Sequence, residues 1–129
     1  MKLVKQTAYG ECAAACLAMI LGEPLARVVA EVTDRIGPAN MAEGMMTTDV
    51  VDHLRLNGFT DPRITHYWDG SQPAILAVPS LNHTDVFHAI VWDGAKFLDP
   101  GEGPLLYPAD ADPRARQRAA IIWGKEPRS

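Results

Sequence analysis

The sequence is poor in the features that mark several classes of protein. It has only 2 cysteines and 7% aromatic residues, and its 12 Lys and Arg are outnumbered by 16 Asp and Glu. In a reducing compartment 2 cysteines are expected as free thiols rather than as a disulfide framework. The net charge of −4, without a dense basic face, predicts no nucleic-acid binding. We interpret the one small basic group, Arg114, Arg116 and Arg118, as a solvated face.

Long apolar runs are missing as well. The longest run, from Cys12 to Leu21, is too short to cross a bilayer as a helix. The first residues, Met1-Lys2-Leu3-Val4-Lys5, lack the apolar core of a secretory signal. We therefore expect no membrane span and a cytoplasmic protein, with signal-less export or injection left open.

What is present is the composition of an ordinary globular domain. Hydrophobic residues make up 47% of the chain and charged residues 22%. A chain of 129 residues is expected to form one domain, spanning residues 1–129. That length buries a core large enough to be stable without disulfides.

The first half of the chain has helical periodicity. Alanine, leucine and methionine favour a helix over Glu11–Leu21, and Gly22 ends it. Apolar residues at helical spacing predict a second helix over Pro24–Ile36. We expect a loop over residues 39–46 and then a third helix, which Thr47 or Thr48 caps and which ends at Asn57-Gly58.

After Gly58 the pattern changes to that of strands. The Asp93-Gly94 pair predicts a tight turn between two of them. A short helix over Arg114–Ala120 competes with the last strand. Helices followed by an antiparallel sheet predict an α+β domain, with an active site in the cleft between the two layers. The expected strands are Arg63–Trp68, Ala74–Val78, Val86–Trp92, Lys96–Asp99 and Ala119–Trp123.

Cys12 is the candidate nucleophile, because it stands at the start of the first predicted helix. The helix dipole and the free N–H groups of the first turn favour a thiolate at that position. The alternative is a small buried hydrophobic residue, which is the usual role of a free cysteine. Cys16 fits that alternative better, since it lies one turn deeper in the apolar run.

Three further residues supply the partners that a thiolate nucleophile needs. Gln6, just upstream, can donate an amide N–H to an oxyanion, together with a backbone N–H. His88 shares one face of its strand with Val86, Ile90 and Trp92 and is the candidate base, ahead of His83 in the preceding turn. Asp99 lies near the level of His88 across the predicted hairpin and can orient its imidazole; Asp85 is the second candidate. The remaining histidines, His53 and His66, are expected at the surface, and Asp93 is expected to serve the turn.

The stretch Gln6–Met19, with its Glu-Cys-Ala-Ala-Ala-Cys-Leu-Ala-Met run, resembles the N-terminal motif of the C39 peptidases. These are papain-like cysteine peptidase domains known from bacteriocin-processing transporters. The resemblance continues, in order, through the segments Gly44–Phe59, Pro73–Val78, His88–Val91, Asp99-Pro100 and Trp123-Gly124.

The resemblance implies a papain-like fold and a role for each of four residues. Gln6 would be the oxyanion donor, Cys12 the nucleophile, His88 the general base and acid, and Asp99 the orienting residue. The chain departs from the family in having Ala13 where glycine usually follows the nucleophile. No transporter segment follows in this chain, so the leader-peptide substrates of the family do not carry over.

The sequence thus predicts a cofactor-free cysteine peptidase that cleaves a peptide or isopeptide bond. Its partner would be a peptide or protein, with small residues at the cleavage site to suit Gly10, Ala13 and Gly44. The same residues could also deamidate or transfer an acyl group, as in an injected effector or a phage protein. A silent peptide-binding module is a further alternative. The last alternative is a zinc site of Cys12, Cys16, His83 and His88. The sequence does not indicate the oligomeric state.

Overall fold

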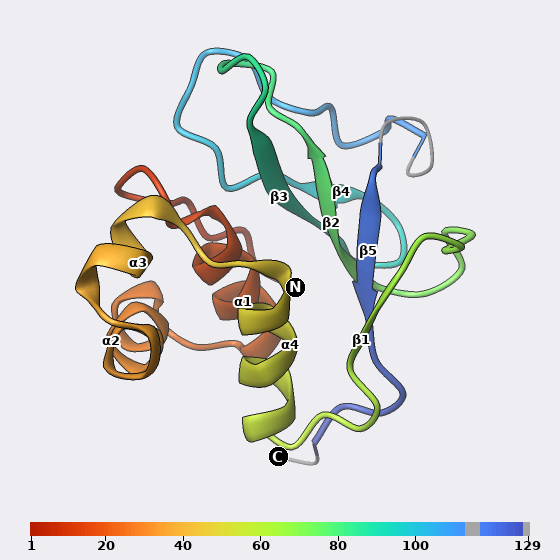
Figure 1. Ribbon diagram of the computed structural model, residues 1–129. Helices are drawn as coiled ribbons and strands as arrows, with labels where there is room; N and C mark the ends of the chain where they lie inside the picture. Colours follow the sequence, from red (N-terminus) through yellow and green to blue (C-terminus); the bar gives the residue numbers. More distant parts are fainter. Residues whose placement is uncertain (113–116, 128–129) are drawn as a thin grey trace.

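The computed structural model describes residues 1–112 and 117–127, and over these residues the chain forms two layers (Figure 1). Four helices lie on one side and a five-stranded antiparallel sheet lies on the other within the described residues, so the predicted α+β class is confirmed. The helices are α1 (Cys12–Leu21), α2 (Leu25–Ile36), α3 (Pro38–Glu43) and α4 (Thr47–Leu56).

The first two helices begin and end close to where the sequence predicts. Gly22 ends α1 in the left-handed conformation, with φ 67°, and its N–H bonds to the carbonyl oxygen of Ala18. Helix α2 follows Pro24 directly and buries Val28 and Val32 against the rest of the layer. Glycine tolerates the left-handed conformation and proline suits the first turn, so both boundaries have a local cause.

The expected loop over residues 39–46 is wrong for its first part, which forms the short helix α3. Pro38 stands at the first helical position, where its missing N–H costs nothing, and Met41 is buried as the anchor of the helix. The expected threonine cap of α4 is also wrong, since Thr47 is already helical. Asp49 reaches back instead and accepts the N–H of Met46 at 2.9 Å.

The five strands of the sheet pair in the order β1-β5-β2-β3-β4. The hairpin of β3 and β4 turns at Gly94-Ala95 as predicted, and Asp93 accepts the N–H groups of Ala95 and Lys96. Strand β4 stops at Leu98, before Pro100, which has no N–H for a ladder. The strands are β1 (Arg63–Thr65), β2 (Ala74–Pro79), β3 (Phe87–Trp92), β4 (Phe97–Leu98) and β5 (Ala119–Ile122).

Near the C-terminus the sequence predicts either a helix or a strand, and the described residues form the strand. Residues 113–116 lie outside the described residues. Gln117 and Arg118 are not helical, and Ala119 and Ala120 belong to β5. β5 pairs with both β1 and β2, so the final strand is an inner strand of the sheet. β1 is shorter than expected because the chain leaves the ladder after Thr65.

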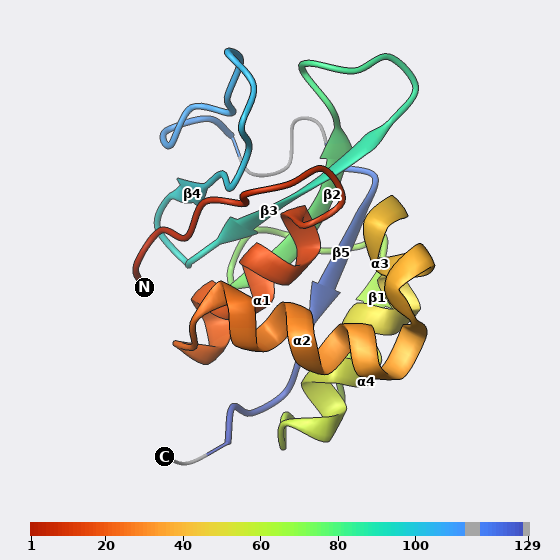
Figure 2. The same cartoon turned by 90° about the vertical axis from the view of Figure 1, so that its left-hand side faces the viewer.

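A hydrophobic core lies on each face of the sheet. Helix α1 is packed between α2, α4 and β3, at the centre of the molecule (Figure 2). Leu17, Val91 and Ile121 belong to the core between helices and sheet, whereas Ile90 and Trp92 belong to the core on the opposite face. The predicted alternation of β3 is therefore confirmed. Burying a side chain such as Leu17 contributes about 1.5–3 kcal/mol, so α1 is held firmly in place.

Within the described residues no single helix has the length and apolarity to cross a membrane. Helices α1 and α2 meet the criteria of length and composition only as a pair bent by 119°.

Candidate active site

A pocket of about 510 Å³ lies where the two layers meet, and residues of both layers line it. The four residues singled out from the sequence all contribute to its walls. The lining residues include Gln6, Tyr9, Gly10, Cys12, Glu43, Gly44, His83, His88, Asp99, Gly101 and Gly103. The folded chain therefore brings Gln6 and Asp99, which are 93 positions apart, to the same pocket.

Cys12 is the first residue of α1 and is half-buried in this pocket. Burial by itself raises the pKa of the thiol. Hydrogen bonds from the imidazole of His88 and from the N–H groups of Ala89 and Ala13 outweigh burial, so the pKa of Cys12 falls below its ordinary value of 9.0. This is the setting of a reactive thiol.

Cys16 has the opposite environment. Its side chain is completely buried in the core of the helical layer, and burial raises the pKa of this thiol well above 9.0. Both cysteines are free thiols. Cys16 is therefore buried as expected, whereas the reactivity of Cys12 stays a prediction.

The imidazole of His88 lies between Cys12 and Asp99. Its Nε2 is 2.7 Å from Oδ1 of Asp99, which leaves Nδ1 as the nitrogen for the thiol. The side chain of His88 is 16% exposed and that of Asp99 is 5% exposed. Burial by itself lowers the pKa of His88, but the hydrogen bonds to Asp99 and Cys12 outweigh it and raise this pKa from 6.5 to about 9. The arrangement favours an imidazolium beside a thiolate.

Three donors hold the carboxylate of Asp99. Besides His88, the N–H of Gly101 donates to Oδ1 at 2.8 Å, and the N–H of Tyr107 donates to Oδ2 at 2.9 Å. Burial raises the pKa of Asp99, but these hydrogen bonds outweigh it and hold the pKa below its ordinary 3.8. Asp85, the second candidate, lies in an exposed turn with φ 60°. Asp99 therefore accepts the hydrogen bond of His88, and Asp85 does not.

The N-terminal segment runs beside the segment that follows β4 (Figure 2). The N–H of Gln6 donates to the carbonyl oxygen of Pro100 at 3.0 Å. The ammonium of Lys5 donates to the carbonyl oxygens of Asp99, at 2.9 Å, and of Gly101, at 3.2 Å. Sequence reasoning missed Lys5, because these partners are more than ninety positions away and no local pattern signals them.

Gln6 lines the pocket from the loop that precedes α1. Its Nε2 donates to the carbonyl oxygen of Ala8 at 3.1 Å. The same loop fits closely against α3 at Gly10, where φ is 89° and an added Cβ would lie 2.6 Å from the carbonyl oxygen of Ala42. Glycine is therefore required at position 10 on both conformational and steric grounds.

Of the small residues expected near the cleft, two line the pocket and one lies in the hydrophobic core. Gly10 and Gly44 line the pocket, together with Gly101 and Gly103, which sequence reasoning did not single out. Ala13 is wrong as a cleft residue: it is buried among the core residues of the helical layer. Its side chain points away from the pocket because it follows Cys12 on the helix, where successive residues face different directions.

The other histidines do not join this cluster. His83 is exposed in the β2–β3 turn, and its ring meets the ring of Tyr9 edge to face at 5.9 Å. His66 is exposed, as expected, and its Nδ1 lies 2.9 Å from the carbonyl oxygen of Arg118.

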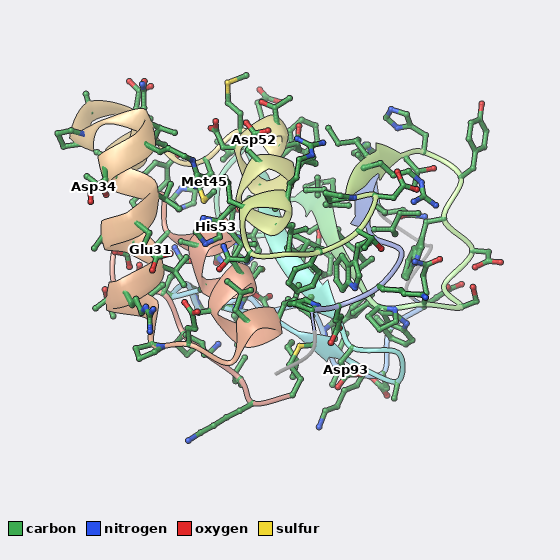
Figure 3. All side chains as sticks on the ribbon, turned by 90° about the horizontal axis from the view of Figure 1, so that it is seen from below. Glu31, Asp34, Met45, Asp52, His53 and Asp93 are labelled. Atoms are coloured by element: carbon green, nitrogen blue, oxygen red, sulfur yellow. The ribbon has the colours of Figure 1, made fainter. Side chains whose placement is uncertain are left out.

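The expectation of a surface position for His53 is wrong. Its side chain is 1% exposed and lies in the helical layer, on α4 facing Glu31 of α2 (Figure 3). Its Nδ1 is 3.1 Å from a guanidinium nitrogen of Arg35, and its Nε2 is 3.9 Å from Glu31. Helix α2 covers a face of α4 that the helical period alone did not mark as buried.

The alternative zinc site is not assembled. Across residues 1–112 and 117–127, no group of three or more His, Cys, Asp and Glu side chains is arranged to hold a metal ion. Cys12, Cys16, His83 and His88 all belong to this part of the chain. Cys16 points into the core, and His83 contacts Tyr9 instead.

Comparison with protein-family models and with curated proteins finds no match for this chain. The function is therefore inferred from the geometry of the pocket and from the motifs of the sequence.

Proposed function

We propose that this protein is a thiol hydrolase that cleaves a peptide or isopeptide bond, with Cys12 as nucleophile. The single observation that carries the proposal is the position of His88, whose Nε2 is 2.7 Å from Oδ1 of Asp99 and whose imidazole lowers the pKa of the Cys12 thiol. A nucleophile, a base and a group that orients the base are the parts that covalent acyl transfer requires. They meet in a pocket open to substrate.

The proposed reaction begins with the thiolate of Cys12 attacking the carbonyl carbon of the amide. The carbonyl oxygen becomes an oxyanion, which a second N–H of the Gln6 amide and a backbone N–H at the start of α1 stabilise. The C–N bond breaks as the imidazolium of His88 gives its proton to the leaving amine. Water then gives a proton to His88 and attacks the thioester carbonyl. The C–S bond breaks, the carboxylic acid is released, and Cys12 leaves as a thiolate beside the imidazolium of His88, which restores the ion pair.

Asp99 holds the imidazole in the orientation that this cycle needs. Its three hydrogen bonds keep it ionised, and its bond to Nε2 leaves Nδ1 as the ring nitrogen available to the thiol. The resemblance of the segment Gln6–Met19 to the C39 peptidases assigns the same roles and supports a papain-like arrangement of the α+β domain. A peptide or protein is the substrate that we propose.

The first experiment measures alkylation of Cys12 and Cys16 by iodoacetamide across pH, with each site read by mass spectrometry. We expect Cys12 to react at a pH below the ordinary thiol pKa of 9.0 and Cys16 to stay unmodified in the folded protein. His88→Ala is expected to move the inflection at Cys12 upward. Equal and slow reaction of both cysteines would contradict the thiolate–imidazolium pair.

The second experiment tests the bond that is cleaved. The protein is incubated with a library of peptides derived from a proteome, and new termini are identified by mass spectrometry, with Cys12→Ala as the matched control. We expect new termini with the wild type only. Conversion of glutamine side chains to carboxylates would instead indicate a deamidase. A reactive Cys12 that produces no change in any peptide would support a binding module.

A further inference from the structure

The loop that carries Gln6 is held by the carboxylate of Glu11. One oxygen of this carboxylate, Oε1, accepts three hydrogen bonds from two consecutive residues of the loop. The N–H of Thr7 donates at 2.8 Å, the hydroxyl of Thr7 at 2.8 Å, and the N–H of Ala8 at 3.0 Å. Hydrogen bonds to an ionised acceptor are about twice as strong as neutral ones, so this is the strongest fixed point of the loop.

Glu11 stands where a helix cap is expected, but it does not cap α1. It is the N-cap residue, and its side chain makes no hydrogen bond to the first turn. An N-cap side chain usually accepts the N–H of the second or third helical residue. Here the carboxylate turns backwards, so the first-turn N–H groups beside Cys12 are left for the thiolate and for an oxyanion.

The contact passes from Glu11 to Gln6 through one residue, Ala8. The N–H of Ala8 donates to Glu11, and the carbonyl oxygen of Ala8 accepts Nε2 of Gln6 at 3.1 Å. The backbone N–H of Glu11 also donates to that carbonyl oxygen, at 3.3 Å. The other amide atom of Gln6, Oε1, is buried without a hydrogen-bond partner among the described residues. The direction of the Gln6 amide therefore depends on where Ala8 is held.

We propose that Glu11 is a positioning residue, which fixes the Thr7–Ala8 turn so that the Gln6 amide is directed at the oxyanion while the start of α1 stays open. The inference rests on the proposed function. It adds to that function a residue that neither attacks nor transfers a proton. Glu11 stabilises the transition state through Gln6 alone.

Two reagents separate this role from the reactivity of the thiol. p-Nitrophenyl acetate acylates Cys12: the thiolate attacks the ester carbonyl, an oxyanion forms, and p-nitrophenolate leaves. Iodoacetamide alkylates the same thiolate by displacing iodide and forms no oxyanion. The ratio of the two rates, measured at a pH where Cys12 is fully thiolate, therefore reports oxyanion stabilisation and not thiol ionisation.

We expect Glu11→Ala to lower the acylation rate about tenfold or more. Gln6→Ala removes an oxyanion donor outright and is expected to lower the same rate by a factor on the order of 10²–10³. Alkylation is expected to change by less than about twofold, since the thiolate itself is unaltered. Glu11→Gln keeps an acceptor oxygen of the same reach and is expected to retain most of the acylation rate. The double variant Gln6→Ala/Glu11→Ala should be no slower than Gln6→Ala, because the two residues act as one unit.

Glu11→Gly keeps the test decisive if the alanine variant folds poorly. Glycine is tolerated at an N-cap position, and without a side chain it neither reaches Thr7 and Ala8 nor occupies the first-turn N–H groups. It should show the same selective loss of acylation, with a thermal unfolding midpoint close to that of the wild type.

The positioning role would be overturned if Glu11→Ala lowered the acylation and alkylation rates equally. It would also be overturned if the loss of acylation in the double variant equalled the product of the losses in the two single variants. An acylation rate in Glu11→Gly equal to that of the wild type would overturn it as well. Failure of the proposed function looks different: the wild type itself would then show no selective reaction of Cys12 with either reagent.

Discussion

Gly101 lies so close to Asp99 that a methyl group on Gly101 would stand 2.9 Å from Oδ1 of Asp99. The same methyl group would be 3.3 Å from Nε2 of His88. Gly101 also donates its N–H to Oδ1 at 2.8 Å. Glycine is needed at this position because the carboxylate and the imidazole meet above its backbone, where there is no room for a side chain.

Gly101→Ala is therefore expected to separate His88 from Asp99 and to raise the pH at which Cys12 becomes reactive. The measurement is the pH profile of iodoacetamide alkylation at Cys12, with the thermal unfolding midpoint as a check of folding. Glu102→Ala, at the exposed neighbouring position, is the matched control and should leave the profile unchanged. An unaltered profile in Gly101→Ala would show that the contact tolerates a methyl group.

Asp99→Asn tests the electrostatic part of the same contact. The substitution keeps the size of the side chain but removes the charge that raises the pKa of His88 to about 9. We expect the His88 titration, followed by NMR of the ring protons, to move down toward 6.5. The fraction of Cys12 that is thiolate at neutral pH should fall about tenfold for each unit by which the pKa of Cys12 rises. A His88 midpoint that stays near 9 would assign the raised pKa to Cys12 instead.

The pH dependence of stability separates His88 from Cys12. In the wild type, the raised pKa of His88 and the lowered pKa of Cys12 act on the free energy of unfolding in opposite directions as the pH rises above 6.5. Cys12→Ser removes the thiol and leaves the raised pKa of His88 uncompensated. Its stabilisation is then fully present below 6.5 and is lost as pH rises through the folded-state pKa.

We therefore expect the free energy of unfolding of Cys12→Ser, measured in urea, to fall by on the order of 1–2 kcal/mol as the pH rises from 6.5 to about 9. The control, Cys12→Ser/His88→Gln, lacks the titrating group and should show no such loss. Equal slopes in the two variants would contradict the assignment to His88.

The burial of His53 leads us to expect a separate loss of stability in acid. Burial lowers the pKa of its imidazole, and the nearby guanidinium of Arg35 lowers it further, while Glu31 acts weakly in the other direction. A histidine with a lowered pKa contributes stability above its unfolded value of 6.5, and this contribution is lost as pH falls through the folded-state pKa. We expect the free energy of unfolding to fall between pH 7 and pH 5.

His53→Leu should flatten this part of the stability profile measured by urea unfolding. Leucine has a similar volume and leaves no buried polar atom, so stability at neutral pH should change by less than about 1 kcal/mol. His66→Leu is the matched control, since His66 is exposed, and it should retain the slope of the wild type. A slope that persists in His53→Leu would assign the acid sensitivity to other groups.

Local signals located most of the elements and the members of the candidate site. Gly22 and Pro24 set helix boundaries, Asp93-Gly94 set the β-hairpin turn, and the position of Cys12 at a helix start marked it as the candidate nucleophile. The predictions of helix boundaries and of the turn succeeded because each depends on residues within a few positions of one another. The helix over residues 38–43 was missed, because its stability comes from burying Met41 and from the contact of α3 with Gly10 rather than from its own composition.

The sequence by itself determined the order of helices and strands. It also determined which chemical groups are available to a site: two thiols, the amide of Gln6, and several imidazoles and carboxylates. Only the tertiary structure decided which of them meet. It selected Asp99 over Asp85 as the partner of His88, buried His53, and joined Lys5 to residues ninety-four and ninety-six positions away. The physical reason is that burial and hydrogen-bond geometry depend on how two layers close on each other, and that packing is encoded across the whole chain rather than in any one segment.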